Sequence, residues 1–255
     1  MNLHYHVEGE GDAIVLIHGL FGSADNLGLL ARSLKDNYKV ISVDLRNHGR
    51  SPHSETFSYQ AMAQDVLQVI DHLDLPRFSL IGHSMGGKVA MALTALAAPR
   101  IRHLLVLDIA PVAYHEHRHE NVFAGLQAVN QHSVNKRSEA DQYLAQHVMD
   151  PGVRQFLLKS FTKMPEGHYA WRFNVEGLIA NYATIMGWPE IPAFHGNTLF
   201  MKGQLSDYLL PAHRKAIQRQ FPTAKAHQVA NTGHWLHAEK PETVNRIILN
   251  FLQTA

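Results

Sequence analysis

The chain has 255 residues, of which 45% are hydrophobic and 18% charged, and this composition is typical of a folded globular protein. It has no cysteine, which excludes disulfides, thiol nucleophiles and thiolate metal ligands. Its formal net charge of +1 favours neither nucleic acid nor an anionic membrane as a partner. The first residues show no apolar signal segment and no window has the length of a membrane span, so we expect a cytoplasmic protein.

Short apolar segments alternate with amphipathic stretches along most of the chain. The apolar segments cover residues 13–18, 38–44, 77–82, 102–108, 197–203 and 225–230. Strands that are apolar throughout, separated by helices with one apolar face, are typical of a mostly parallel sheet covered on both sides. We therefore predict an α/β fold, with an antiparallel strand added before residue 13.

The pattern changes between residues 113 and 190. No strong strand pattern occurs there, and helical stretches are separated by turns that contain Pro and Gly. We predict an all-helical cap, inserted after the strand that ends at Asp108, on a core formed by residues 1–112 and 191–255. Insertions at the carboxyl ends of parallel strands lie over the crevice where such sheets bind ligands. We expect a lid over the active site, with an additional helical layer of no catalytic role as the alternative.

Ser84 lies where a predicted strand passes into a predicted helix. It is the centre of a G-x-S-x-G pattern whose glycines are Gly82 and Gly86. A serine on such a strained turn needs small neighbours, because the strand and the helix pass close together. We therefore predict Ser84 as a nucleophile. Lys88, in the first turns of the helix, is expected to be solvated.

A serine nucleophile requires oxyanion donors and a general base. Two N–H groups should point at the developing oxyanion, one from Met85 after the nucleophile and one from Leu20 in the loop after the first central strand. A histidine is the usual base. His234 lies between the last predicted strand and the final helix, and we prefer it to His237, which is part of the approach to that helix.

Several motifs of the chain occur together in one group of enzymes. The sequence contains HGLFGSADN, DLRNHGRSP, GHSMGGK and GHWLHAEKP. Together these motifs resemble the α/β-hydrolase fold, and within it the YbfF-like family of bacterial serine esterases. The resemblance covers nearly the whole chain and implies hydrolysis of short carboxylic esters and acyl-CoA thioesters. It is least clear between residues 130 and 169, in the predicted cap, where we expect substrate choice to be decided.

The acid that should orient His234 is not in the family's commonest position. That position lies three residues beyond a glycine, after the strand that follows the cap, and here it is Ser206. Asp207 comes one residue late, which should turn its side chain away. Asp108 ends the preceding strand of the sheet, beside the strand of Ser84, and a carboxylate buried there needs a partner. We predict Asp108 as the acid with Ser206 hydrogen-bonded near it; Asp207 as the acid, with Asp108 structural, is the alternative.

Side chains near these motifs are candidates for substrate contact. We predict that Phe21, Trp171 and Trp235 line an acyl pocket. Arg172 could bind a phosphate or carboxylate of the substrate, although a salt bridge within the cap is the preferred interpretation.

The predicted mechanism needs no cofactor and no metal. His115 and His119 would share a face of a helix and could bind a metal ion, but their spacing is not that of a zinc hydrolase, and a polar start to the cap is preferred. A carbon–carbon bond hydrolase or a cofactor-free perhydrolase could use the same three residues. A ligand receptor that has lost turnover is the alternative outside enzymes. The substrate is expected to be a small molecule, and the oligomeric state has no signal in the sequence.

Overall fold

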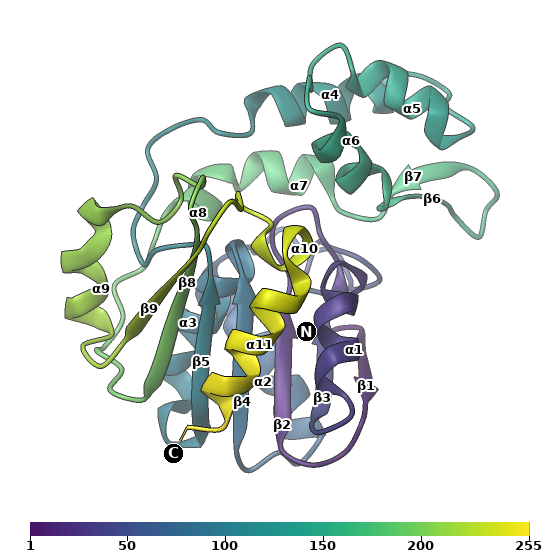
Figure 1. Ribbon diagram of the computed structural model, residues 1–255. Helices are drawn as coiled ribbons and strands as arrows, with labels where there is room; N and C mark the ends of the chain where they lie inside the picture. The colour runs from purple at the N-terminus through teal and green to yellow at the C-terminus, as the bar shows by residue number, and fades with distance from the viewer. Residues whose placement is uncertain (255) are drawn as a thin grey trace.

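The computed structural model describes residues 1–254, which form a seven-stranded sheet with helices on both faces (Figure 1). The strand order is β1-β3-β2-β4-β5-β8-β9, and β1 alone is antiparallel to its neighbour. The strands are β1 (Tyr5–Glu8), β2 (Ala13–Ile17), β3 (Lys39–Val43), β4 (Phe78–His83), β5 (Ile101–Leu107), β8 (Asn197–Gly203) and β9 (Lys225–Val229). The predicted mostly parallel α/β sheet is confirmed, including its antiparallel first strand.

The sheet separates two apolar layers, which explains why its strands lack polar alternation. Along β2, Val15 and Ile17 pack with α2 and α3, whereas Ile14 and Leu16 pack with α1 and α11. Each side chain of this strand therefore enters an apolar layer, as expected for a parallel sheet covered on both faces. The core helices are α1 (Gly28–Leu34), α2 (Tyr59–His72), α3 (Met85–Ala97), α9 (Arg214–Gln220), α10 (Leu236–Glu239) and α11 (Pro241–Leu252). Three short 3-10 helices cover Ala24–Leu27, Ala98–Arg100 and Pro211–His213.

Residues 113–190, hereafter the insertion, lie over the carboxyl ends of the strands (Figure 1). The insertion contains α4 (Glu120–Asn130), α5 (Arg137–Leu144), α6 (Pro151–Leu158), β6 (Phe161–Lys163), β7 (Tyr169–Trp171), α7 (Val175–Ala180) and α8 (Tyr182–Met186). The prediction that it is all-helical is wrong, because β6 and β7 pair as an antiparallel hairpin. Strands of three residues are too short to show an alternating pattern, and their pairing depends on the turn that contains Gly167 at a φ of 97°. No helix within residues 1–254 has the length and hydropathy to cross a membrane.

Lys88 joins the insertion to the core and is not solvated as the sequence suggested. Its side chain is 1% exposed, and Nζ donates to the carbonyl oxygens of Gly187 at 2.7 Å and Met186 at 3.3 Å. The ammonium group also faces the ring of Tyr114, with Nζ 4.8 Å from the centroid. Burial lowers the pKa of Lys88 to about 7. Tyr59 adds a second connection by donating its hydroxyl to the carbonyl of Ile185 at 2.5 Å.

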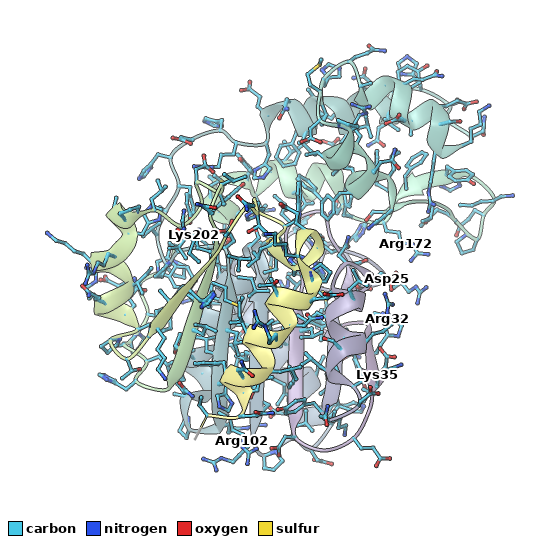
Figure 2. All side chains as sticks on the ribbon, viewed as in Figure 1. Asp25, Arg32, Lys35, Arg102, Arg172 and Lys202 are labelled. Atoms are coloured by element: carbon cyan, nitrogen blue, oxygen red, sulfur yellow. The ribbon has the colours of Figure 1, made fainter. Side chains whose placement is uncertain are left out.

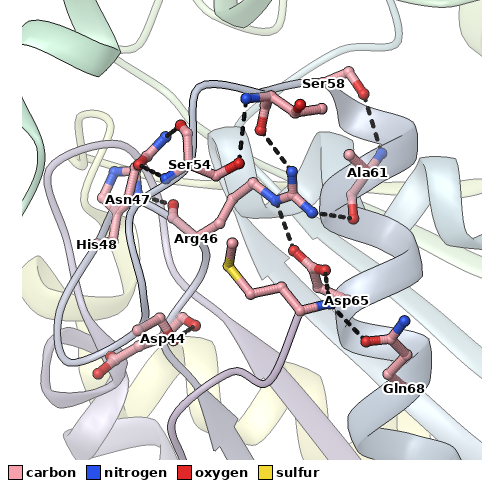
Figure 3. A network of polar contacts seen from close by, with 12 residues as sticks. Asp44, Arg46, Asn47, His48, Ser54, Ser58, Ala61, Asp65 and Gln68 are labelled. Atoms are coloured by element: carbon pink, nitrogen blue, oxygen red, sulfur yellow. Dashed lines mark hydrogen bonds and ion pairs between the residues drawn. The ribbon is translucent and has the colours of Figure 1, made fainter.

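A network of polar contacts holds the loop after β3 (Figure 3). Arg46 donates to Asp65 at 2.6 Å, and the amino terminus donates to the other oxygen of that carboxylate at 2.7 Å. The side-chain oxygen of Asn47 accepts from the N–H of Ser54 at 2.8 Å. The backbone N–H of Asn174, at the start of α7, donates to the carbonyl of Asn47 at 2.9 Å. The loop is therefore fixed to α2 on one side and to the insertion on the other.

Candidate active site

Ser84 occupies the sharp turn between β4 and α3. Its φ of 55° and ψ of −124° are strained for a residue with a side chain. The neighbouring glycines are required by close contact, since a Cβ on Gly82 would lie 2.2 Å from the carbonyl oxygen of Gly86. A Cβ on Gly86 would lie 2.2 Å from the carbonyl oxygen of Ile17 on β2. The packing of helix against strands thus explains the G-x-S-x-G pattern and leaves the Ser84 side chain partly accessible.

The structure brings Ser84, His234 and Asp108 together in one hydrogen-bonded chain. His234 lies in the loop between β9 and α10, with Nε2 2.9 Å from Oγ of Ser84. Its Nδ1 lies 2.7 Å from Oδ2 of Asp108. Because the carboxylate accepts, Nδ1 carries the proton and Nε2 accepts from the serine hydroxyl. His237 makes no contact of this kind; its ring packs against His83 instead.

Asp108 follows β5 directly and is completely buried. Its carboxylate accepts hydrogen bonds from the backbone N–H of Gly203 at 3.0 Å, from the hydroxyl of Ser206 and from His234. These three donors compensate for the loss of water around the charge. Lys202, at the carboxyl end of β8 (Figure 2), donates to the carbonyl of Ser206 at 2.9 Å and holds that residue in place.

Asp207 points away from this chain of contacts. Its side chain is 66% exposed and pairs with Arg118 of the insertion at 2.7 Å. The one-residue offset seen in the sequence therefore has the expected geometric effect. The structure places Asp108, with Ser206 beside it, next to the imidazole of His234.

The predicted oxyanion donors lie on either side of Ser84. Met85 is the first residue of α3, where backbone N–H groups have no partner within the helix. Leu20 belongs to a turn that closes with a 3.1 Å hydrogen bond from the N–H of Gly22 to the carbonyl of Gly19. A Cβ on Gly19 would lie 3.1 Å from Cβ of Ser84, so this turn packs directly against the serine. Within residues 1–254 the N–H groups of Leu20 and Met85 make no hydrogen bond.

A cavity of about 830 Å³ opens onto Ser84 and His234. From the core, Phe21 and Trp235, two of the residues predicted to line an acyl pocket, contribute to its wall, and Leu20 lies beside them. The insertion supplies a further part of the wall from α4 and the residue before it, the segment before α6, and α6 itself. These side chains are His119, Val122, Val148, Val153, Phe156 and Leu157. Away from Ser84 and His234, the lining of this cavity is mostly apolar, as expected of a site for an acyl group.

Trp171 and Arg172 lie outside the cavity, which corrects their prediction as substrate contacts. Trp171 is buried in β7, where its ring stacks on Phe173 with centroids 5.3 Å apart. Arg172 lies at the base of the β6–β7 hairpin (Figure 2), and its Nε donates to Oγ1 of Thr162 at 3.1 Å. The hairpin that the sequence did not reveal carries both side chains away from Ser84.

Some residues around His234 were not singled out from the sequence. The ring of Tyr208 stacks on the imidazole of His234 with centroids 4.0 Å apart and 23° between the planes. The guanidinium of Arg118 lies over the ring of Tyr208, 4.6 Å from its centroid. Nε2 of His83 donates to the backbone carbonyl of His234 at 2.8 Å. The position of His83 beside the nucleophile in the sequence was a signal for its role, but the stacking of Tyr208 and Arg118 depends on the tertiary structure.

Burial keeps several histidines around the cavity neutral. It lowers the pKa values of His119 and His237 to about 4 each, and it lowers the pKa of His83 well below its usual range. These rings are therefore uncharged near pH 7 and act as polar packing groups.

His115 and His119 were the candidate ligands of a metal site that the sequence left as an alternative. His115 and His119 precede α4 in irregular chain and share no helical face. Nδ1 of His119 lies 2.8 Å from the hydroxyl of Tyr182. In the part of the chain that the structure describes, no three His, Asp or Glu side chains are grouped as metal ligands.

Comparison with known proteins shows the family of the chain. The profile of the alpha/beta hydrolase family matches residues 14–247. The chain belongs to this family. It is 48% identical to esterase YbfF of Escherichia coli (strain K12) over 94% of this chain and 92% of the relative. It is also 39% identical to the sn-1-specific diacylglycerol lipase ABHD11 of Mus musculus, over 94% and 80% of the two chains.

A solved structure of a marine microorganism esterase superimposes with a TM-score of 0.95. The two sequences are 36% identical, and the alignment covers 98% of this chain and 99% of the other. The chain is thus an alpha/beta hydrolase of the esterase and lipase type.

Proposed function

We propose that the protein is a serine hydrolase that cleaves carboxylic esters through an acyl-enzyme. The observation that carries the proposal is the continuous contact from Ser84 through His234 to Asp108 at the floor of an apolar cavity. Such a chain makes a serine hydroxyl nucleophilic near neutral pH, because the imidazole accepts its proton and the carboxylate stabilises the resulting imidazolium.

The proposed reaction has two halves. In the first, Oγ of Ser84 attacks the acyl carbon, Nε2 of His234 takes the hydroxyl proton, and the N–H groups of Leu20 and Met85 stabilise the oxyanion. His234 then gives the proton to the leaving alkoxide, and the acyl group remains on Ser84. In the second half, His234 takes a proton from water and the resulting hydroxide attacks the acyl carbon. The bond between the acyl carbon and Oγ of Ser84 then breaks, His234 returns the proton to Oγ, and the acid is released. Asp108 keeps the proton on Nδ1 throughout.

The proposed substrate is a small ester whose acyl group enters the apolar cavity. We propose that residues 1–112 and 191–255 form the core domain that performs the chemistry, and that the cap domain, residues 113–190, selects the acyl group. The support is that the insertion supplies a large part of the cavity wall but none of the three contacting groups. Acyl-CoA thioesters are the second proposed class, since they present the same carbonyl and Lys159 lies exposed on the cavity lining, where it could face an anionic leaving group.

The proposal is tested on purified wild type and Ser84→Ala with p-nitrophenyl esters and acyl-CoA thioesters of increasing chain length. Loss of the serine should reduce kcat by about ten-thousandfold or more, because the three residues act as a unit. A fluorophosphonate probe should label wild type and leave Ser84→Ala unlabelled. Hydrolysis or labelling that persists in Ser84→Ala would refute the proposal. A wild type inactive on every ester and thioester would instead favour a carbon–carbon bond hydrolase, a perhydrolase or a receptor.

A further inference from the structure

The turn that carries Leu20 is held in a strained form. Phe21, its third residue, has a φ of 62°, in the left-handed region that side chains other than glycine rarely adopt. In a four-residue turn, a positive φ at the third position is characteristic of type II, where glycine is preferred. A non-glycine residue remains there only if its surroundings fix it. The contacts of Phe21 therefore show what keeps this turn, residues 19–22, in place beside Ser84.

Two buried histidines connect this turn reciprocally to the loop after β3. His18, before the turn, accepts the N–H of Leu45 on Nε2 at 3.0 Å. His48, in the loop, accepts the N–H of Phe21 on Nε2 at 3.2 Å. Each ring thus belongs to one segment and accepts a backbone N–H of the other. Asp44 adds a third connection by accepting the N–H of Ala24 at 2.7 Å.

The tautomer of His48 follows from its contacts. Since Nε2 accepts from Phe21, the neutral ring carries its proton on Nδ1, which lies 3.0 Å from the carbonyl oxygen of Arg46. Burial lowers the pKa of His48 to about 3, so the ring stays neutral and Nε2 stays an acceptor over the working range of pH. Both ring nitrogens are therefore committed to backbone groups, and His48 has no proton to exchange with substrate.

The insertion holds the same residue from the other side. Oγ of Ser160, between α6 and β6, donates to the carbonyl oxygen of Phe21 at 3.2 Å. The ring of Phe21 packs edge-on or tilted against insertion aromatics, with centroid distances of 5.9 Å to His119, 5.4 Å to Phe123 and 5.4 Å to Phe173. The N–H of Phe21 is thus fixed by the core, whereas its carbonyl and its ring are fixed by the insertion.

We propose that His48 and Ser160 are positioning residues that hold the oxyanion turn in its active conformation. The insertion then contributes to the rate of acyl transfer, beyond its contribution to the shape of the pocket. This inference rests on the proposed esterase function, because it requires that the N–H of Leu20 stabilises an oxyanion. Neither residue touches the reacting atoms; each acts through the backbone of Phe21.

The test compares His48→Phe with His48→Gln on the smallest ester that the enzyme hydrolyses. Phenylalanine fills the space but cannot accept the N–H of Phe21, and kcat should fall about 10- to 100-fold with KM within about twofold, less than the loss expected when an oxyanion donor is removed outright. Glutamine can place an acceptor near the position of Nε2 and should restore most of kcat. Affinity for a trifluoromethyl ketone, which forms a tetrahedral oxyanion on the serine, should fall in proportion to kcat.

Ser160→Ala and Tyr59→Phe form a matched pair from the contacts between insertion and core. Each removes one hydroxyl that donates to a backbone carbonyl across that boundary, but only the first contacts Phe21. Ser160→Ala should lower kcat on the smallest ester about 3- to 10-fold, in line with the loss of one hydrogen bond. Tyr59→Phe should leave kcat unchanged, although both variants lose stability.

The outcomes separate this inference from the proposed function. Equal kcat values in wild type, His48→Phe and Ser160→Ala would overturn the inference and leave the esterase function intact. Equal losses in Ser160→Ala and Tyr59→Phe would also overturn it, since a general loosening of the insertion would then explain both. If His48→Phe does not fold, Ser160→Ala and Tyr59→Phe decide the question. A wild type without Ser84-dependent hydrolysis would overturn the function and this inference together.

Discussion

The proposed function divides chemistry and recognition between two regions of the molecule. Ser84, Asp108 and His234 follow strands β4, β5 and β9, whose positions are fixed by hydrogen bonds to neighbouring strands. The insertion provides cavity wall from helices and loops, several of which are half-exposed. Reacting groups must be held to within fractions of an ångström, whereas a wall for an acyl chain tolerates variation. Under this proposal, a change in the insertion alters the substrate while the sheet keeps the reacting groups in place.

The boundary between the regions is less simple than this division suggests. Arg118 of the insertion pairs with Asp207 and covers Tyr208, which stacks on His234. Ser160 of the insertion contacts the turn of Leu20 through Phe21. The insertion therefore supports two parts of the proposed machinery without supplying a reacting group.

The largest expected effect contrasts two carboxylates, Asp108, which is buried beside His234, and Asp207, which is exposed and pairs with Arg118. Asp108→Asn should lower kcat on the order of ten-thousandfold, because an amide at this position favours the wrong tautomer of His234. Asp207→Asn removes an exposed pair with Arg118 and should change kcat by less than about threefold. Steady-state kinetics on folded variants, with circular dichroism as the control, measures both. A larger loss in Asp207→Asn than in Asp108→Asn would contradict the assignment of the acid.

The next largest effect should distinguish a tryptophan of the cavity wall from a tryptophan buried within the insertion. Trp235 lines the cavity and Trp171 does not. Trp235→Ala should shift the preference among acyl chain lengths about tenfold, with little change in thermal stability. Trp171→Ala should instead lower the free energy of unfolding by about 3–5 kcal/mol and keep the ranking of esters, because it empties a buried aromatic cluster. If Trp171→Ala changed the ranking as much as Trp235→Ala, the insertion would shape specificity through its core as well.

The smallest expected effect concerns the junction of the two regions at Lys88. Burial places its folded-state pKa near 7, below the ordinary 10.5, so between these values the unfolded chain binds more protons. The unfolding free energy of wild type relative to Lys88→Met should therefore rise from pH 7 to pH 9, by at most about 1.4 kcal/mol per pH unit, and stay level below pH 7. Urea unfolding at several pH values measures the difference. Parallel curves for the two proteins would show that Lys88 does not titrate in this range.

The local sequence pattern was sufficient to predict the strands and helices of the core and to select the proposed nucleophile and base. The strands were visible because both of their faces are buried, which leaves a continuous apolar run. Ser84 was visible because the close approach of α3 to β2 and β4 demands glycine on either side of it. His234 was visible because a histidine followed the last strand, at the edge where parallel strands place their ends.

The insertion was harder to predict because its contacts join residues that share no periodic pattern. The β6–β7 hairpin is shorter than the window in which alternation can be recognised. From the sequence, Lys88 was expected to be solvated. In the structure, backbone carbonyls from residues about a hundred positions later accept hydrogen bonds from its ammonium group. The positions of Trp171 and Arg172 relative to the cavity depended on that same hairpin.

By itself, the sequence determined the sheet, the strand-to-helix turn at Ser84 and the set of acids that could serve His234, because each of these follows from short-range sterics or from burial of continuous apolar runs. Only the tertiary structure decided which side chains surround the site. The contacts among His48, Phe21 and Ser160, and the stacking of Tyr208 on His234, join residues from separate elements of the chain. Their geometry is set by how the loop after β3, the strand ends and the insertion pack, and no local periodicity encodes that packing.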